Sequence, residues 1–98
     1  MPSKMSPSLK LASRVRINEN VLFQELQGEA VLLNLTSGVY FGLDQMGTRI
    51  WQLLGKQELL SDVAQSIMAE YDVSQECCVA DLLALTADLQ RHGLVTVC

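Results

Sequence analysis

The chain has 98 residues, 49% of them hydrophobic, and a formal net charge of −4 at pH 7. This length suits a single domain with one core. No apolar run approaches the roughly 18 residues that a membrane span requires, and the N-terminus lacks the apolar stretch of a signal peptide, so we expect a cytoplasmic protein without membrane contact. Residues 57–98 carry one arginine against seven acidic residues. Such a surface repels phosphate, so we predict no nucleic-acid partner.

Residues 1–18 are predicted to form a mobile N-terminal arm, followed by one domain over residues 19–98. The first 13 residues hold both prolines and four serines. They show no apolar periodicity, which is typical of chain ends that do not pack.

A two-residue alternation of apolar side chains predicts three strands, Val21–Leu26, Ala30–Leu35 and Val39–Leu43. Gly28 and Gly38 lie in the two short connections, where glycine accommodates a positive φ. Two tight turns in succession predict an antiparallel three-stranded meander. Apolar residues over 94–97 could add a short final strand.

The apolar repeat then changes to the helical period of 3.6 residues. Asp44 is placed to cap a first helix that ends at Gly55, and Trp51 is expected to anchor this helix in the core. A second helix is predicted over 60–71, and a third runs from a cap at Ser74 to Gly93. The order predicts a winged-helix-like α+β domain, with a three-stranded antiparallel meander followed by three helices.

Catalytic or metal-binding residues are not recognisable in the sequence. His92 lies at a predicted helix end, where its side chain can satisfy the last carbonyl groups. Neither a Ser/His/Asp set nor a phosphate-binding glycine loop can be assembled. Cys77, Cys78 and Cys98 lack the spacing of a zinc site and are interpreted as reduced thiols, with Cys78 half-buried. We therefore predict a non-catalytic protein without metal or cofactor.

The second and third predicted helices could also form a helix-turn-helix, whose last helix would enter the major groove of DNA. That helix carries Glu76, Asp81 and Asp88, whereas groove-reading helices need the opposite sign. Asp81 and Asp88 share one face, which is either solvated or a docking surface for a basic partner. A DNA-binding transcription regulator remains the alternative function, and a small enzyme is a third.

The segment from Val31 to Trp51, with Leu-Asn-Leu, Thr-Ser-Gly, Tyr-Phe and Ile-Trp in this order, resembles the PqqD family. The resemblance covers about residues 20–96. Its later pieces follow in order and are Gly55, Glu70-Tyr71-Asp72, Asp81-Leu82, Leu89 and Gly93-Leu94. Members dedicated to pyrroloquinoline quinone synthesis carry a Tyr-Pro-Glu-Gly-like segment where this chain has residues 34–38, which favours a PqqD-like member serving another peptide.

The resemblance implies a peptide chaperone, or recognition element, for ribosomally made and modified peptides. Such proteins bind the leader of a precursor peptide and present it to a modifying enzyme, often a radical-SAM protein. The peptide is implied to add as a strand beside the third strand, in a groove against the third helix. We also predict that the chain can pair with a second copy of itself.

The predicted peptide site combines an open strand edge with a second apolar row on the third helix. The strand would contribute main-chain groups, and glycine within it would allow close backbone approach. The helix would contribute a groove wall, unless its row is buried against the first helix instead. The site residues are Val39, Tyr40, Phe41, Gly42, Val79, Leu83 and Thr86.

Overall fold

The computed structural model describes residues 9–97, so residues 1–8 of the predicted arm and Cys98 lie outside the described residues. The order confirms the predicted α+β winged-helix-like fold and adds a strand at its start. The elements are β1 (Val15–Ile17), β2 (Val21–Leu26), β3 (Glu29–Asn34), β4 (Tyr40–Leu43), α1 (Gln45–Leu54), α2 (Leu60–Glu70), α3 (Gln75–Arg91) and β5 (Val95–Val97).

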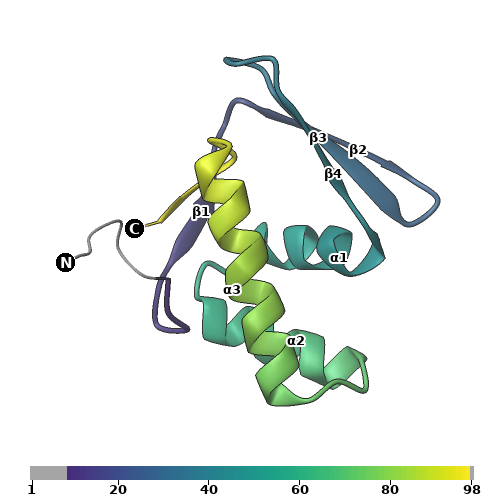
Figure 1. Cartoon of the computed structure of the whole chain (residues 1–98), viewed down its shortest axis with the longest axis vertical. Helices are drawn as coiled ribbons and strands as arrows, with labels where there is room; N and C mark the ends of the chain where they lie inside the picture. Colours follow the sequence, from purple (N-terminus) through teal and green to yellow (C-terminus); the bar gives the residue numbers. More distant parts are fainter. Residues whose placement is uncertain (1–8, 98) are drawn as a thin grey trace.

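Strands β2, β3 and β4 form one antiparallel sheet in this order, which extends over the helices as a wing (Figure 1). The β2–β3 hairpin turns at Gln27 and Gly28, whose φ angles of 58° and 84° both lie in the left-handed region. A two-residue hairpin turn of this kind matches the right-handed twist of the strands that it joins. Gly38 has a φ of 78° in the β3–β4 connection. The two predicted glycine turns are confirmed.

The two faces of this sheet differ in burial. Leu32 is fully buried and pairs with Phe41, so both side chains lie on the face that packs on the helices. The next residue, Leu33, pairs with Leu22 and Tyr40, which are 48% and 70% exposed on the other face. This alternation follows from the two-residue repeat of a strand. The sheet therefore has a buried inner face and an exposed, largely apolar outer face.

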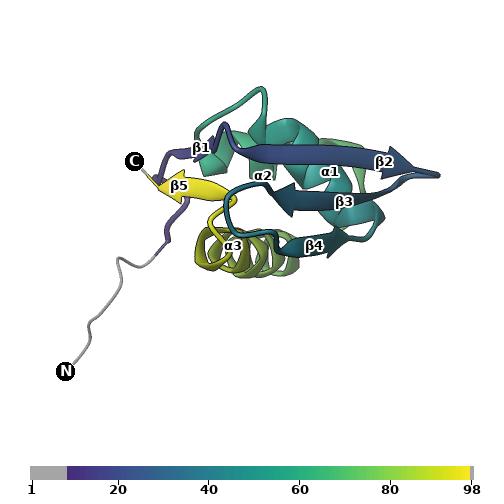
Figure 2. The ribbon, with the colours of Figure 1, turned by 90° about the horizontal axis from the view of Figure 1, so that it is seen from above.

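Strands β1 and β5 join the two ends of the domain in a second antiparallel sheet (Figure 2). Val15 is fully buried at the start of β1, and burial of such a side chain contributes about 1.5–3 kcal/mol. The predicted arm of residues 1–18 is wrong in this part, because residues 15–17 are a paired strand of the core and the domain begins before residue 19. The predicted final strand is confirmed as β5.

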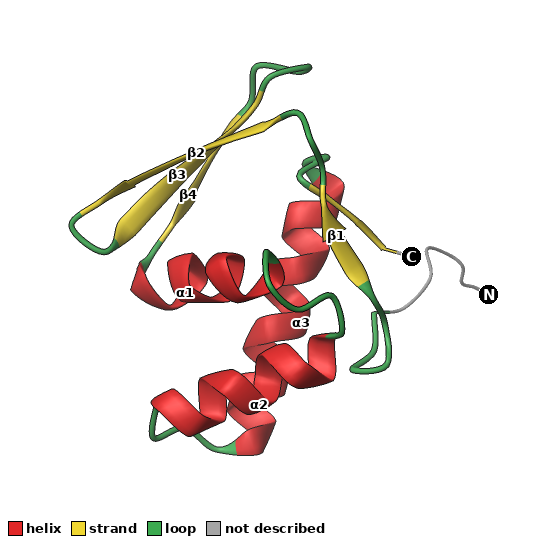
Figure 3. Ribbon diagram, turned by 180° about the vertical axis from the view of Figure 1, so that it is seen from behind, coloured by secondary structure: helices red, strands yellow, loops and turns green. Residues whose placement is uncertain are grey.

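Helices α1 and α3 begin at the predicted caps, whereas α2 begins after Leu59 without a side-chain cap. The three helices pack against one another beneath the wing (Figure 3). The Asp44 carboxylate accepts a hydrogen bond from the Gly47 N–H at 2.8 Å, and the Ser74 hydroxyl accepts one from Cys77 at 3.2 Å. Both acceptors satisfy N–H groups that a helix start leaves unpaired.

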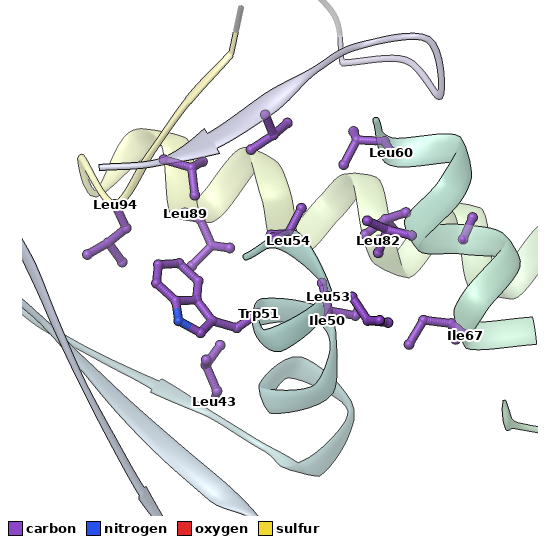
Figure 4. Packing of buried hydrophobic residues seen from close by; sticks show 14 of the residues in the cluster. Leu43, Ile50, Trp51, Leu53, Leu54, Leu60, Ile67, Leu82, Leu89 and Leu94 are labelled. Atoms are coloured by element: carbon purple, nitrogen blue, oxygen red, sulfur yellow. The ribbon is translucent and has the colours of Figure 1, made fainter. Parts of the chain in front are cut away.

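Trp51 lies where the sheet, α1 and α3 meet. Its side chain is only 6% exposed, and Figure 4 shows the indole ring among Leu43, Leu89 and Leu94. The predicted core position of this residue is confirmed.

The buried side chain of Asn34 ties the wing to the end of α3. Its Oδ1 accepts hydrogen bonds from the main-chain N–H groups of Thr36 and Ser37, at 2.9 and 3.2 Å. Its Nδ2 donates to the carbonyl oxygens of His92 at 3.0 Å and Gly93 at 3.4 Å. Because this one side chain forms hydrogen bonds with both the β3–β4 connection and the end of α3, it fixes the position of the sheet relative to α3.

We expect Asn34→Ala to lower the free energy of unfolding by about 2–3 kcal/mol, because it removes the hydrogen bonds of a buried side chain to part-buried main-chain groups. Asn20→Ala is the control, since Asn20 donates to Asn34 from a less buried place at 3.1 Å, and its loss should cost less than about 1 kcal/mol. Urea unfolding followed by circular dichroism measures both. Equal stability losses would contradict the role given to Asn34.

Candidate functional site

A groove of about 540 Å³ runs between β4 and α3. Its floor is apolar and is built from three elements, because the inner face of β4, the first turns of α1 and one flank of α3 converge there. The apolar side chains that line it are Phe41, Leu43, Met46, Ile50 and Leu85. Gly42 and Gly47 also line the groove, and Asp44 and Asp81 border it.

The edge of β4 beside this groove is open, because β3 is the only strand that pairs with β4 within the described chain. The Asn34 N–H donates to the Val39 carbonyl at 2.9 Å, so this pair is of the hydrogen-bonded type. Hydrogen-bonded and non-hydrogen-bonded pairs alternate along an antiparallel ladder. The Phe41 main chain therefore bonds to β3, whereas the main-chain groups of Tyr40 and Gly42 point to the open edge.

This alternation separates the roles of the four predicted strand residues. The main-chain N–H and C=O groups of Tyr40 and Gly42 are available for pairing, while the Phe41 side chain, which is half-buried, lines the groove. The Val39 carbonyl is already bonded within the sheet, and this residue is 42% exposed just before β4. Apart from Gly42 and its chain neighbours, no atom lies within 4 Å of the place where a Cβ on Gly42 would be. The outer face of β4 is therefore sterically open at this position.

Phe41, which lines the groove, also packs against His92 at the end of α3. Their rings meet edge to face, with the ring centroids 5.0 Å apart. The His92 Nδ1 lies 2.7 Å from the Asp88 carbonyl oxygen, which fixes the imidazole at the end of α3. His92 thus holds the helix end, as predicted, and also contacts the inner face of β4.

The predicted helix residues lie away from this groove. Thr86 is fully buried and its hydroxyl donates to the Leu82 carbonyl at 2.7 Å. Leu83 packs partly against the core, and Val79 lines a separate depression together with Leu11. The predicted groove wall of Val79, Leu83 and Thr86 is therefore wrong, because this row lies on the flank of α3 that faces away from β4.

Leu85 and Asp81 form the helix wall of the groove instead. Residues two apart on an α-helix lie on nearly opposite sides, so the flank of Leu85 is not the flank of Leu83. Leu85 lies one helical turn after the buried Leu82 and is half-buried at the border of the core and the groove. The apolar repeat of α3 could have indicated Leu85, because it marks the face of the helix that packs on the core. This face has two borders, and only one of them faces the sheet.

The described residues contain no cluster of three or more His, Cys, Asp or Glu side chains that could hold a metal ion. Cys78 is more buried than predicted, at 6% exposure, and Cys77 is exposed. Burial, with a smaller contribution from the charge of Asp81, raises the pKa of the Cys78 thiol. A raised pKa keeps this thiol protonated and unreactive at neutral pH.

A winged-helix domain with an open strand edge above an apolar groove is the class that the fold and the groove define. Within this class the chain belongs to the PqqD family. Residues 29–95, well over half of the chain, match the family described as "Coenzyme PQQ synthesis protein D (PqqD)". The comparison with curated proteins gave no match.

Two solved structures share this fold at moderate sequence identity. One is described as "TbiB1 in Complex with the TbiA(beta) Leader Peptide" and is 35% identical, with a TM-score of 0.77 over 82% of this chain and 93% of that chain. The other, "Lasso peptide synthetase B1 complexed with the leader peptide", is 28% identical, with a TM-score of 0.75 over 85% of this chain and 98% of that chain. Both relatives are thus described as complexes with leader peptides.

Proposed function

We propose that this chain binds the leader segment of a ribosomally made precursor peptide by strand addition to β4 and presents it to a peptide-modifying enzyme. The observation that carries this proposal is the open edge at Tyr40 and Gly42 directly beside the apolar groove. A strand added to such an edge gains main-chain hydrogen bonds, and its alternate side chains enter the groove. The leader-peptide complexes of the two relatives support the same role.

In this role the chain performs no turnover itself, and the chemistry belongs to its partner enzyme. A radical-SAM protein stays a prediction for that partner, as does a pathway other than pyrroloquinoline quinone. The relatives support the latter, since one is described in complex with the TbiA(beta) leader peptide and the other as a lasso peptide synthetase. Precursor peptides are translated on ribosomes, which is consistent with a cytoplasmic site of action. No helix in the described part of the chain could cross a bilayer.

DNA binding is disfavoured by the charge of α3, the helix that would enter the major groove. Its described side chains include Glu76, Asp81 and Asp88, and Arg91 at its end pairs with Asp88. A helix of this sign meets the phosphates of DNA unfavourably. Pairing with a second copy of the chain also stays a prediction, and the open edge of β2 is where we place it.

The test is a titration of the full chain with the N-terminal segment of each short peptide that its neighbouring genes encode, and separately with duplex DNA. We expect amide shift changes for the peptide at residues 40–43, Asp81 and Leu85. Tight DNA binding with a steep loss at higher salt would overturn the proposal. Shift changes confined to the β2–β3 hairpin would move the site to the other edge of the sheet.

A matched pair of helix variants tests the groove itself. We expect Leu85→Gln to weaken peptide binding about 5- to 10-fold, because it removes apolar contact from the groove wall. Leu83→Gln is the control, since Leu83 is also half-buried on α3 but lies on the other flank. Its affinity should change less than about twofold once both variants are shown to be folded. Isothermal titration calorimetry measures this difference, and equal losses would contradict the placement of the peptide.

A further inference from the structure

Two carboxylates border the groove at the end where β4 passes into α1. Asp44 immediately follows β4, and Asp81 lies on the flank of α3 that faces it. Both residues are exposed, and both line the same groove as the apolar floor. The groove therefore combines an apolar surface with a local excess of negative charge at one end.

No lysine or arginine lines the groove beside these carboxylates in the described part of the chain. The ion pairs among the described residues join Arg16 to Glu58, Arg49 to Glu70 and Arg91 to Asp88, and none of these arginines lines the groove. Lys10, Arg14 and Lys56 do not line it either. An occupant of the groove therefore meets two acidic side chains whose charge is not offset by a basic neighbour there.

The two carboxylates differ in how far they are already engaged. One oxygen of Asp44 accepts the Gly47 N–H at 2.8 Å, and the positive end of the α1 dipole partly offsets its charge. Asp81 lies inside α3, more than one turn beyond the Ser74 cap, where the helix dipole offers little compensation. Asp81 is therefore the stronger site for a cation.

We propose that the peptide bound along β4 carries a lysine or arginine two residues away from the apolar side chain that fills the groove. This inference rests on the proposed function and adds the chemistry of the ligand to it. Same-face side chains of an added strand recur every second residue, about 6.6 Å apart. An apolar residue opposite Phe41 and Leu85 therefore places its second neighbour at the end bordered by Asp44 and Asp81.

A long basic side chain fits both the apolar floor and the two carboxylates at this end of the groove. Its methylene stem covers apolar floor beside Leu43 and Met46, while its charged head stays in water near the carboxylates. An acidic residue at the same position would meet two like charges. The groove thus selects between peptides by charge as well as by the fit of an apolar side chain.

The experiment selects peptides from a displayed library of random 12-residue sequences on the full chain. We expect enriched sequences to carry lysine or arginine two positions from a large apolar residue. The same selection on Asp81→Asn should lose this enrichment, because asparagine keeps the shape of the side chain without its charge. Asp62→Asn on α2 is the control, since it removes one charge far from the groove.

A selected peptide then gives the size of the effect. We expect Asp81→Asn to weaken its binding about 2- to 5-fold, the range of an exposed ion pair. Asp44→Asn, which preserves the helix cap, should weaken it less. Exchange of the basic residue of the peptide for glutamate should cost more than either variant, and Asp81→Lys should recover part of that loss, as a double-mutant cycle shows.

The outcomes separate this inference from the proposed function. Selected peptides that shift the amides of residues 40–43 but show no basic enrichment overturn the charge selection and leave leader binding intact. Unchanged affinity in Asp81→Asn, measured at low salt where such pairs are strongest, overturns it in the same way. Selected peptides that leave β4 unaffected overturn both.

Discussion

Trp51→Ala is expected to lower the free energy of unfolding by about 3–5 kcal/mol. The side chain is 6% exposed and contacts both layers of the fold, so its removal leaves a cavity that the sheet and α3 cannot both close. Native domains are stable by only about 5–15 kcal/mol in total, so such a loss removes a large share of the stability and lowers the melting temperature. Thermal and urea unfolding followed by circular dichroism measure the effect.

The control is Tyr71→Ala, which removes an aromatic side chain that is 39% exposed. This variant should lose less than about 1 kcal/mol, since an exposed side chain leaves little cavity. Peptide binding by Trp51→Ala should fall only as far as the folded fraction falls. A well-folded Trp51→Ala variant with an unchanged melting temperature but weaker peptide binding would show that the residue serves the site and not the core.

Most of the fold was predictable because its signals are local. Asp44 and Ser74 precede helical repeats, glycines lie at both turns of the wing, and Trp51 lies on the apolar face of α1. Strand β1 was missed for the opposite reason. It has three residues, and its partner β5 lies about 80 residues further along the chain, so the pairing that buries Val15 leaves no trace in the nearby sequence.

The groove was predictable only in part. Strand alternation places the Phe41 side chain on the same face as the buried Leu32, and this side chain lines the groove. For α3, the apolar repeat shows which face of the helix packs on the core, but it does not show which flank of that face lies beside β4. That choice depends on how the wing lies across the helices, which the Asn34 hydrogen bonds to the end of α3 help to fix. The helix side of the site therefore needed the three-dimensional structure.

Tyr40→Pro is expected to weaken peptide binding about 10-fold without unfolding the domain. The Tyr40 N–H faces the open edge, so its loss removes no bond within the sheet, and edge positions of this kind tolerate proline. A peptide strand would lose that hydrogen bond and meet the proline ring, and one hydrogen bond alone is worth about 0.5–1.5 kcal/mol. Calorimetry with the precursor segment measures the loss, and Tyr40→Ala controls for the missing phenol ring.

The matched control places a proline on the opposite edge of the same sheet. The Leu35 N–H donates to the Asn20 carbonyl at 2.8 Å, so by the same alternation the Glu25 N–H faces the open edge of β2. Glu25→Pro removes only the exposed acceptor of a 3.1 Å hydrogen bond from Gln52 Nε2, so it should leave the sheet pairing and peptide binding unchanged. If Glu25→Pro weakens binding while Tyr40→Pro does not, the peptide pairs with β2, and the groove between β4 and α3 is not its site.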